Sequence, residues 1–176
     1  MSKVIILTGS SGAGKSSAGE KLAKTLLGTW AFISQDGTRK FIKSGFKSPD
    51  EPWTDETKKQ WEVSIAICSD MIKRYHQAEI NCVVELFSPP AEFEKWRKRL
   101  KNIPYTLIVL LPNLEENIRR NANRKIPMKE FQVRENYEWF SAYKTDQAII
   151  LDTSHQTLAE TVKHIKKNFI GHGVET

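Results

Sequence analysis

The chain has 176 residues, a length that fits one domain with its own core and leaves little room for a second. Its 27 Lys and Arg outnumber its 21 Asp and Glu, and the net charge of +6 suits a protein that binds anionic nucleotides and leaves nucleic acid open as a partner. No apolar run approaches the roughly 20 residues that span a bilayer, and the N-terminus has no signal-peptide pattern. We therefore expect a cytoplasmic protein that inserts into no membrane, with Cys68 and Cys82 as free thiols.

Strand and helix patterns alternate along the chain, which predicts a parallel sheet covered by helices on both faces. Strands that are buried on both sides read as continuous apolar runs, and five runs fit: Val4–Leu7, Trp30–Ile33, Cys82–Leu86, Tyr105–Leu111 and Ala148–Leu151. Helical periodicity covers Lys15–Leu27, Thr54–Ala78, Ala91–Leu100, a segment that starts after the candidate N-cap Asn113, Glu130–Tyr143 and Leu158–Phe169. The expected fold is a three-layer α/β sandwich around a five-stranded parallel sheet, formed by residues 1–176 as a single domain.

The first apolar run leads into Gly9-Ser10-Ser11-Gly12-Ala13-Gly14-Lys15-Ser16, which fits the phosphate-binding pattern G-x-x-x-x-G-K-[ST] between a strand and a helix. Glycines let successive N–H groups converge on an anion, and the helix N-terminus adds the positive end of its dipole. Lys15 places an ammonium group on the β- and γ-phosphates, and the Ser16 hydroxyl can hold Mg²⁺. The pattern predicts a P-loop NTPase fold that binds ATP through Gly9, Ser11, Gly12, Ala13, Gly14, Lys15, Ser16 and Ser17.

Ligands of such sheets bind outside the carboxyl ends of the strands, so the residues that follow each strand are candidate site residues. After the second strand, Asp36 can accept the proton of an attacking hydroxyl and Arg39 can hold the acceptor; the alternative is that Asp36 caps a helix and Arg39 lies on the surface. Glu85 ends the third apolar run as a Walker B carboxylate does, which predicts a contact with Mg²⁺ or its water shell. Residues 152–154 either line the adenine pocket or cap the last helix.

The stretch after the fourth strand is rich in arginine. Arg120 and Arg124 are four residues apart, which places them on one face of a helix, and Pro127 interrupts the helix soon after them. Arginines stabilise the negative charge that develops during phosphoryl transfer. Residues 119–130 are therefore expected to form a small helical lid that closes over the nucleotide and excludes water, and the alternative is a solvated basic helix.

The segment between the second strand and the longest helix, residues 43–55, fits no motif that we can place. It contains one glycine and two prolines, which predicts an irregular chain, and its position predicts that it shapes the acceptor pocket. We expect Phe41, Phe46 and Trp53 to pack in the core, and stacking on a ring of the acceptor is the alternative.

A P-loop identifies a nucleotide-binding protein but not a reaction. GTPases need D-x-x-G and N-K-x-D motifs; the chain has no D-x-x-G, and Tyr143-Lys144-Thr145-Asp146 begins with Tyr instead of Asn. Large ATPases need far more chain. The small kinases remain, in which one compact domain transfers a γ-phosphoryl group to a bound acceptor.

On these residues the chain resembles the small P-loop kinases, in the branch that includes polynucleotide 5′-hydroxyl kinases, chloramphenicol phosphotransferase and zeta toxins. Asp36-Gly37-Thr38-Arg39 matches the Asp-x-x-Arg of polynucleotide kinases, which small-molecule kinases also carry. Arg119-Arg120-Asn121-Ala122-Asn123-Arg124, followed by Pro127, matches their lid, whereas Glu85 stands where Asp is more usual. The resemblance implies ATP and Mg²⁺, Asp36 as the general base, Arg39 on the acceptor phosphate and Arg124 on the transferring group.

Three functions are compatible with these features. The first is an ATP-dependent kinase that phosphorylates a hydroxyl of a small molecule such as a sugar acid, nucleoside or antibiotic, with Lys15, Asp36, Arg124 and Arg120 as catalytic residues. The second is a polynucleotide 5′-hydroxyl kinase, which the lid motif and the positive charge favour. The third is an ATP-binding regulatory or toxin-like protein with little turnover. The sequence defines neither the acceptor nor the oligomeric state.

Overall fold

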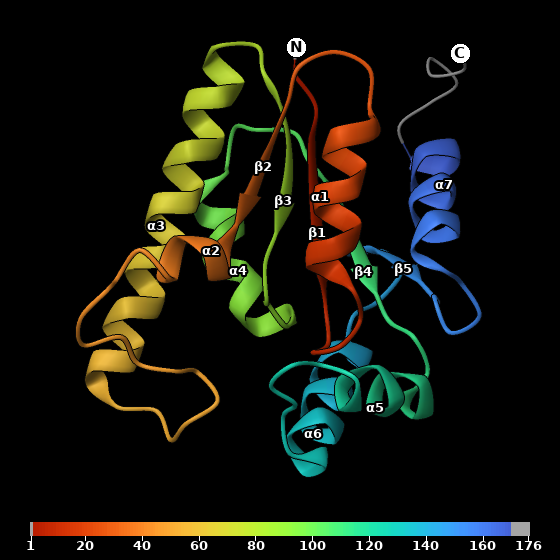
Figure 1. Ribbon diagram of the computed structural model, residues 1–176. Helices are drawn as coiled ribbons and strands as arrows, with labels where there is room; N and C mark the ends of the chain where they lie inside the picture. The colour runs from red at the N-terminus through yellow and green to blue at the C-terminus, as the bar shows by residue number, and fades with distance from the viewer. Residues whose placement is uncertain (1, 170–176) are drawn as a thin grey trace.

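Figure 1 shows the computed structural model, which describes residues 2–169. Its centre is a five-stranded sheet in the order β2-β3-β1-β4-β5, and every neighbouring pair is parallel. The strands are β2 (Trp30–Ser34), β3 (Asn81–Glu85), β1 (Val4–Gly9), β4 (Thr106–Leu110) and β5 (Ile149–Leu151). The predicted five-stranded parallel sheet is confirmed, and each strand starts and ends within two residues of its predicted bounds.

Helices connect the strands in chain order. Within the described residues they are α1 (Lys15–Thr25), α2 (Gln35–Arg39), α3 (Asp55–Gln77), α4 (Pro90–Arg99), α5 (Leu114–Ala122), α6 (Glu130–Ser141) and α7 (Leu158–Phe169). The predicted N-cap of α5 is confirmed, because the backbone N–H of Glu116 donates to Asn113 Oδ1 at 2.9 Å. Of the helices in residues 2–169, none has both the length and the apolar character needed to cross a membrane.

The sheet separates two hydrophobic cores. Side chains of a strand alternate between faces, and in β1 Val4 and Ile6 belong to one core while Ile5 and Leu7 belong to the other. The first core also contains buried residues of α3, α4 and α6, and the second those of α1 and α7. Figure 1 shows this layering, with α5 and α6 beyond the carboxyl end of the central strand.

The aromatic residues of the segment between α2 and α3 differ from the prediction. Phe41, Phe46 and Trp53 are 74%, 40% and 48% exposed, so their expected place in the core is wrong. Hydrogen bonds from Arg39 and to and from Gln60 of α3 hold the backbone of the segment. Trp53 instead packs on Trp61, with ring centroids 5.4 Å apart.

Candidate functional site

The loop from Gly9 to Gly14 turns sharply between β1 and α1. Gly9 has a φ of 147°, and a Cβ atom at this position would lie 2.2 Å from the carbonyl oxygen of Leu110. Gly14 precedes the first residue of α1 with a φ of 87°. Both positions need glycine. The loop therefore passes close to β4, and the backbone N–H groups that follow Gly14 lie at the N-terminus of α1. This is the geometry of a phosphate-binding loop.

Lys15 is buried and bends back over this loop. Its Nζ donates to the carbonyl oxygen of Ser10 at 3.0 Å and lies 5.7 Å from the centre of the Phe87 ring. Burial lowers the pKa of Lys15, while the carboxylates of Glu85 and Asp36 act in the opposite direction. The positive charge of Arg124 adds to the lowering. An anion at the loop would compensate the buried ammonium group directly.

Two oxygen donors lie beside Lys15 at the carboxyl end of the sheet. Ser16 is exposed in the first turn of α1, and Glu85, only 3% exposed, ends β3 opposite Leu7 of β1. Ser34 Oγ donates to Glu85 Oε2 at 2.8 Å, which fixes the carboxylate. Over residues 2–169, no group of three or more His, Cys, Asp or Glu could hold a metal alone. The donor set fits Mg²⁺, which takes one or two protein oxygens and completes its shell with phosphates and water.

Asp36 and Arg39 lie on the short helix α2. The N-cap is Ser34, whose Oγ accepts from the N–H of Gly37 at 3.1 Å, and Arg39 is only 3% exposed. The alternative of an Asp36 cap with a surface Arg39 is therefore wrong in both parts. The side chain of Asp36 is 55% exposed and its Oδ1 lies 3.6 Å from Arg39 Nη1. Asp36 is open to a ligand.

The guanidinium group of Arg39 is engaged by the protein. Its Nη2 donates to the carbonyl oxygen of Lys47 at 2.8 Å, and its Cζ lies 5.1 Å from the Phe46 ring centre and 5.0 Å from that of Trp61. Arg39 Nε is buried and has no partner among the described residues. The predicted contact with the acceptor stays a prediction, and in this structure the side chain holds Asp36 and the segment after α2 together.

The segment between α2 and α3 is anchored at two further points. Gln60 of α3 donates to the carbonyl oxygen of Gly45 at 2.8 Å and accepts from the N–H of Lys47 at 2.9 Å. Gln132 of α6 donates to the carbonyl oxygen of Asp50 at 3.1 Å. The segment is thus fixed along α3 and reaches across to α6.

Arg124 lies beyond the end of α5, so the expectation that Arg120 and Arg124 share one helix face is wrong. The helix ends at Ala122, and the N–H of Arg124 donates to the carbonyl oxygen of Asn121 in a turn. Asn121 also bonds both backbone groups of Met128, at 3.1 Å to its N–H and 2.9 Å to its carbonyl oxygen. These bonds close the base of an exposed loop that carries Arg124.

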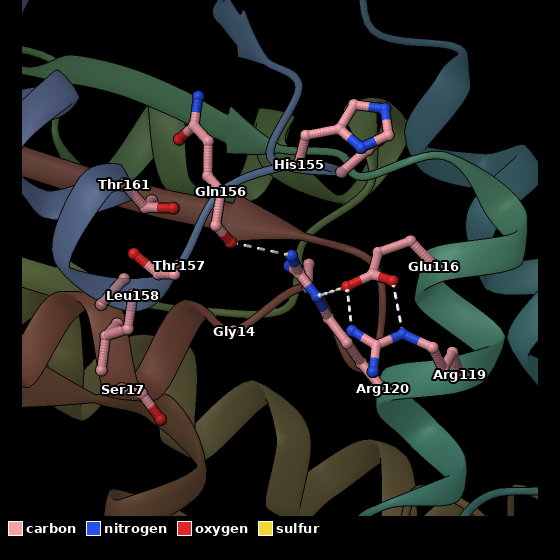
Figure 2. Close-up of a pocket in the computed structure, with 13 residues that line it drawn as sticks. Gly14, Ser17, Glu116, Arg119, Arg120, His155, Gln156, Thr157, Leu158 and Thr161 are labelled. Atoms are coloured by element: carbon pink, nitrogen blue, oxygen red, sulfur yellow. Dashed lines mark hydrogen bonds and ion pairs between the residues drawn. The ribbon is translucent and has the colours of Figure 1, made fainter.

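The side chain of Arg120 extends from α5 towards the loop that follows β5. There it borders a pocket of about 500 Å³ between α5, the start of α1 and the start of α7 (Figure 2). Residues that line this pocket include Gly14, Ser17, Arg119, Ser154, Thr157 and Leu158. Of the predicted adenine-site residues 152–154, Ser154 lines the pocket and Thr153 is fully buried behind it.

Two asparagines that the sequence did not single out tie α5 and α6 to the P-loop. Asn117 Nδ2 donates to Ser10 Oγ at 2.9 Å, and Asn136 Nδ2 donates to Ser11 Oγ at 3.2 Å. Asn117 is fully buried and Asn136 is 6% exposed. A buried polar residue on a helix marks a hydrogen-bond partner nearby, but one sequence does not reveal which helix faces are buried at the sheet edge.

The structure resembles solved kinases over nearly its whole length. A gluconokinase from Sinorhizobium meliloti 1021 is 21% identical with a TM-score of 0.68, covering 92% of this chain and 87% of its own. The tunicamycin resistance protein of Deinococcus radiodurans has the same TM-score at 16% identity and 94% coverage of both chains. Shikimate kinase from Acinetobacter baumannii, solved with shikimate, has 18% identity, a TM-score of 0.64 and coverage of 99% and 97%. At these identities the similarity establishes a P-loop kinase fold.

No curated protein sequence matches the chain. The family model of chloramphenicol phosphotransferase-like proteins matches residues 2–170, which include every candidate site residue described above. The resemblance to this branch of the P-loop kinases is confirmed, and the chain belongs to the chloramphenicol phosphotransferase-like family.

Proposed function

We propose that this chain is an ATP-dependent kinase that transfers the γ-phosphoryl group of ATP to a hydroxyl of a small-molecule acceptor of the sugar-acid, nucleoside or antibiotic type. One observation carries the proposal: the buried ammonium group of Lys15 bends over the P-loop, and three further charges lie around it. Asp36 follows β2, Glu85 ends β3 beside β1 and Arg124 lies in the turn after α5, and all three act on the charge of Lys15. These charges come from four separate parts of the chain. Phosphoryl transfer needs this set, because it requires cations on the transferring group, a carboxylate for the metal and a carboxylate for the nucleophile.

The P-loop and the pocket beside it would hold the two ends of ATP. The loop amides and Lys15 would bind the β- and γ-phosphates, with Lys15 exchanging its bond to Ser10 for a bond to phosphate. The pocket of about 500 Å³ borders Gly14 and Ser17 at the start of α1, so the nucleoside would extend into it. Its volume is in the range of small-molecule sites.

Ser16 and Glu85 would hold Mg²⁺, the serine through its hydroxyl and Glu85 directly or through a water molecule. When bound, the ion would neutralise negative charge on the phosphates. Ser34 keeps the Glu85 carboxylate oriented through its 2.8 Å hydrogen bond. Glu85 is longer than the more usual Asp, and its fixed carboxylate supports a metal contact at this strand end.

Asp36 would engage the acceptor hydroxyl. In the transfer, the acceptor oxygen forms a bond to the γ-phosphorus, the bond from this phosphorus to the β,γ-bridging oxygen breaks, and the hydroxyl proton passes to the Asp36 carboxylate, leaving ADP. The half-exposed position of Asp36 supports this role, because a ligand can reach its oxygens. Arg39 holds Asp36 from the buried side.

Arg124 would close over the transferring group. We predicted a lid of residues 119–130, but α5 is tied to the P-loop through Asn117, and α6 through Asn136. Residues 123–127 form an exposed loop between them, and the described contacts tie it only to α5, through Asn123 and the turn at Arg124, and not to the P-loop. We infer that only this tip moves, carrying the arginine onto the γ-phosphoryl group.

The test is a transfer assay with γ-labelled ATP and Mg²⁺ against sugar acids, nucleosides, phenicol and aminoglycoside antibiotics, and a 5′-hydroxyl oligonucleotide. Label on a small molecule supports the proposal. Label on the oligonucleotide alone, with binding that weakens steeply as salt rises, identifies a polynucleotide kinase instead. Tight ATP binding without transfer to any acceptor indicates a regulatory protein and contradicts the proposal.

A further inference from the structure

Arg120 is the most extensively bonded arginine of the site, and its partners are protein groups. Its Nε donates to Glu116 Oε1 at 2.6 Å. Its Nη1 donates to Thr153 Oγ1 at 3.2 Å, and its Nη2 donates to the carbonyl oxygens of Thr153 at 2.7 Å and Gln156 at 3.3 Å. Every nitrogen of the guanidinium group therefore has a partner, which leaves Arg120 poorly placed to bind a phosphate as well.

The partners of Arg120 lie in the loop between β5 and α7, which forms one wall of the pocket. The loop is also braced from within: Asp152 Oδ1 accepts from the N–H of Ser154 at 2.8 Å, and Ser154 Oγ accepts from the N–H of Asn113 at 2.7 Å. Residues 154–158 line the pocket in succession. Figure 2 shows Arg120 crossing from α5 to this wall, with the carbonyl oxygen of Gln156 directed at its guanidinium group.

Glu116 connects Arg120 to a second arginine at the pocket rim. Arg119 donates to both oxygens of Glu116 at 2.7 Å, and its side chain is 67% exposed, against 22% for Arg120. The two arginines hold the pKa of Glu116 at about 2, well below its usual range. The carboxylate is therefore charged at neutral pH and fixes Arg120 in its inward orientation.

We propose that Glu116 and Arg120 form a clamp that positions residues 154–158 as the nucleoside wall, so that Arg120 is a positioning residue for the nucleoside part of ATP. This inference rests on the proposed function, because it takes the pocket beside the P-loop as the nucleoside site. It replaces the expectation that Arg120 stabilises the transferring phosphoryl group. Arg120 makes three hydrogen bonds to the loop between β5 and α7, two to Thr153 directly before the wall and one to Gln156 within it.

The test compares the affinities of MgATP and magnesium tripolyphosphate by calorimetry in the wild type and in Arg120→Gln. Tripolyphosphate carries the phosphate chain without a nucleoside. We expect Arg120→Gln to weaken MgATP binding about tenfold and to leave tripolyphosphate binding within twofold, because only the nucleoside wall is displaced. Equal weakening of both ligands would place Arg120 on the phosphates, and no change in either would show that the wall does not need the clamp; both results overturn the proposal.

Two further variants serve as a matched control and as an independent test of the clamp. Arg134→Gln removes the matched arginine of an i,i+4 pair with Glu130 on α6, both exposed, and should change neither affinity. Glu116→Gln keeps a hydrogen-bond acceptor but removes the charge, and should give a smaller loss of the same kind even if Arg120→Gln folds poorly. Should the wild type bind neither ligand, the proposed function fails along with the clamp; should it bind both while Arg120→Gln and Glu116→Gln do too, only the clamp fails.

Discussion

The P-loop, which we propose as the nucleotide half of the site, and the region around Asp36, which we propose as its acceptor half, are constructed differently. In the nucleotide half, a loop of consecutive residues is held from three sides, by Leu110 against Gly9 and by Asn117 and Asn136 on its serines. In the acceptor half, one half-exposed carboxylate sits on a five-residue helix next to the long segment 40–54. That segment is anchored by single side chains, chiefly Arg39 and Gln60.

This contrast fits what each half would bind under the proposed function. A triphosphate presents the same oxygens in every kinase, so a rigid set of amides and a lysine can be preorganised for it. Acceptors differ in shape, and the segment that we propose for the acceptor half depends on a few polar contacts of Arg39 and Gln60. Solved kinases of the same fold have names that point to different small molecules, among them a gluconokinase and a shikimate kinase.

The largest effect should come from the centre of the nucleotide half. Replacing Lys15 by alanine removes the only buried cation of the described P-loop, and we expect phosphoryl transfer to fall about a thousandfold, since loss of one donor to a developing anion costs about 10²–10³ in rate. Lys24→Ala, which removes an exposed lysine of α1 paired with Glu20, is the control. Phosphoryl transfer by Lys15→Ala at more than a tenth of the wild-type rate would contradict the assignment of Lys15 to the phosphates of ATP.

Alanine substitutions of Gly9 and Gly45 compare how tightly the two halves are packed. A Cβ at Gly9 would meet backbone at 2.2 Å, so we expect Gly9→Ala to destabilise the fold by about 2 kcal/mol or more, which lowers the melting temperature by about 6 °C. Gly45 in the acceptor half also has a positive φ, 72°, but nothing lies within 4 Å of its Cβ direction. Gly45→Ala should therefore cost about 1 kcal/mol from backbone strain alone. If calorimetry gives equal falls in melting temperature for the two variants, the two halves do not differ in packing at these glycines.

A third variant weakens the acceptor half alone. Arg39→Lys keeps the charge but loses the planar group that spans Asp36, the Lys47 carbonyl and two rings. We expect the KM for the acceptor to rise about tenfold, MgATP affinity to stay unchanged, and trypsin to cleave faster after Lys43 and Lys47. Arg74→Lys on α3 serves as the control. If KM and cleavage both keep their wild-type values, Arg39 does not anchor the segment.

The smallest effect concerns pH. The pKa of Glu116 is lowered to about 2 from an ordinary value of 4.5, so its charged form stabilises the folded protein above pH 4.5, and this contribution disappears as the pH falls from 4.5 to 2. Wild type should exceed Glu116→Gln in unfolding free energy by about 1 kcal/mol at pH 6, after allowance for solvent screening. Denaturant titrations should show the gap closing towards pH 2. A gap that persists at pH 2 would show that the carboxylate charge is not its source.

The P-loop and the sheet around it could be predicted in detail because their information is local. Eight consecutive residues define the loop, and apolar runs that are buried on both faces define the strands around it. A helix after the second strand was only an alternative, since five residues carry too little periodicity. The burial of Arg39 and the capping role of Ser34 were not predicted. Arg120 and Arg124 were expected to share a helix face because they are four residues apart, but spacing does not reveal that α5 ends at Ala122. The asparagine anchors depend on contacts between residues more than 100 positions apart, which no local pattern encodes.

The role of the acceptor half depends on Asp36, and one comparison tests it directly. With an acceptor identified by label transfer, the rate of transfer at saturating MgATP is measured for wild type, Asp36→Asn and the control Asp55→Asn, a fully exposed aspartate at the start of α3. We predict that Asp36→Asn lowers this rate by about 10²–10⁴ while the Kd for MgATP changes less than twofold and Asp55→Asn behaves as wild type. Transfer by Asp36→Asn at the wild-type rate would contradict the assignment of Asp36 to the acceptor hydroxyl and the division of the site into two halves.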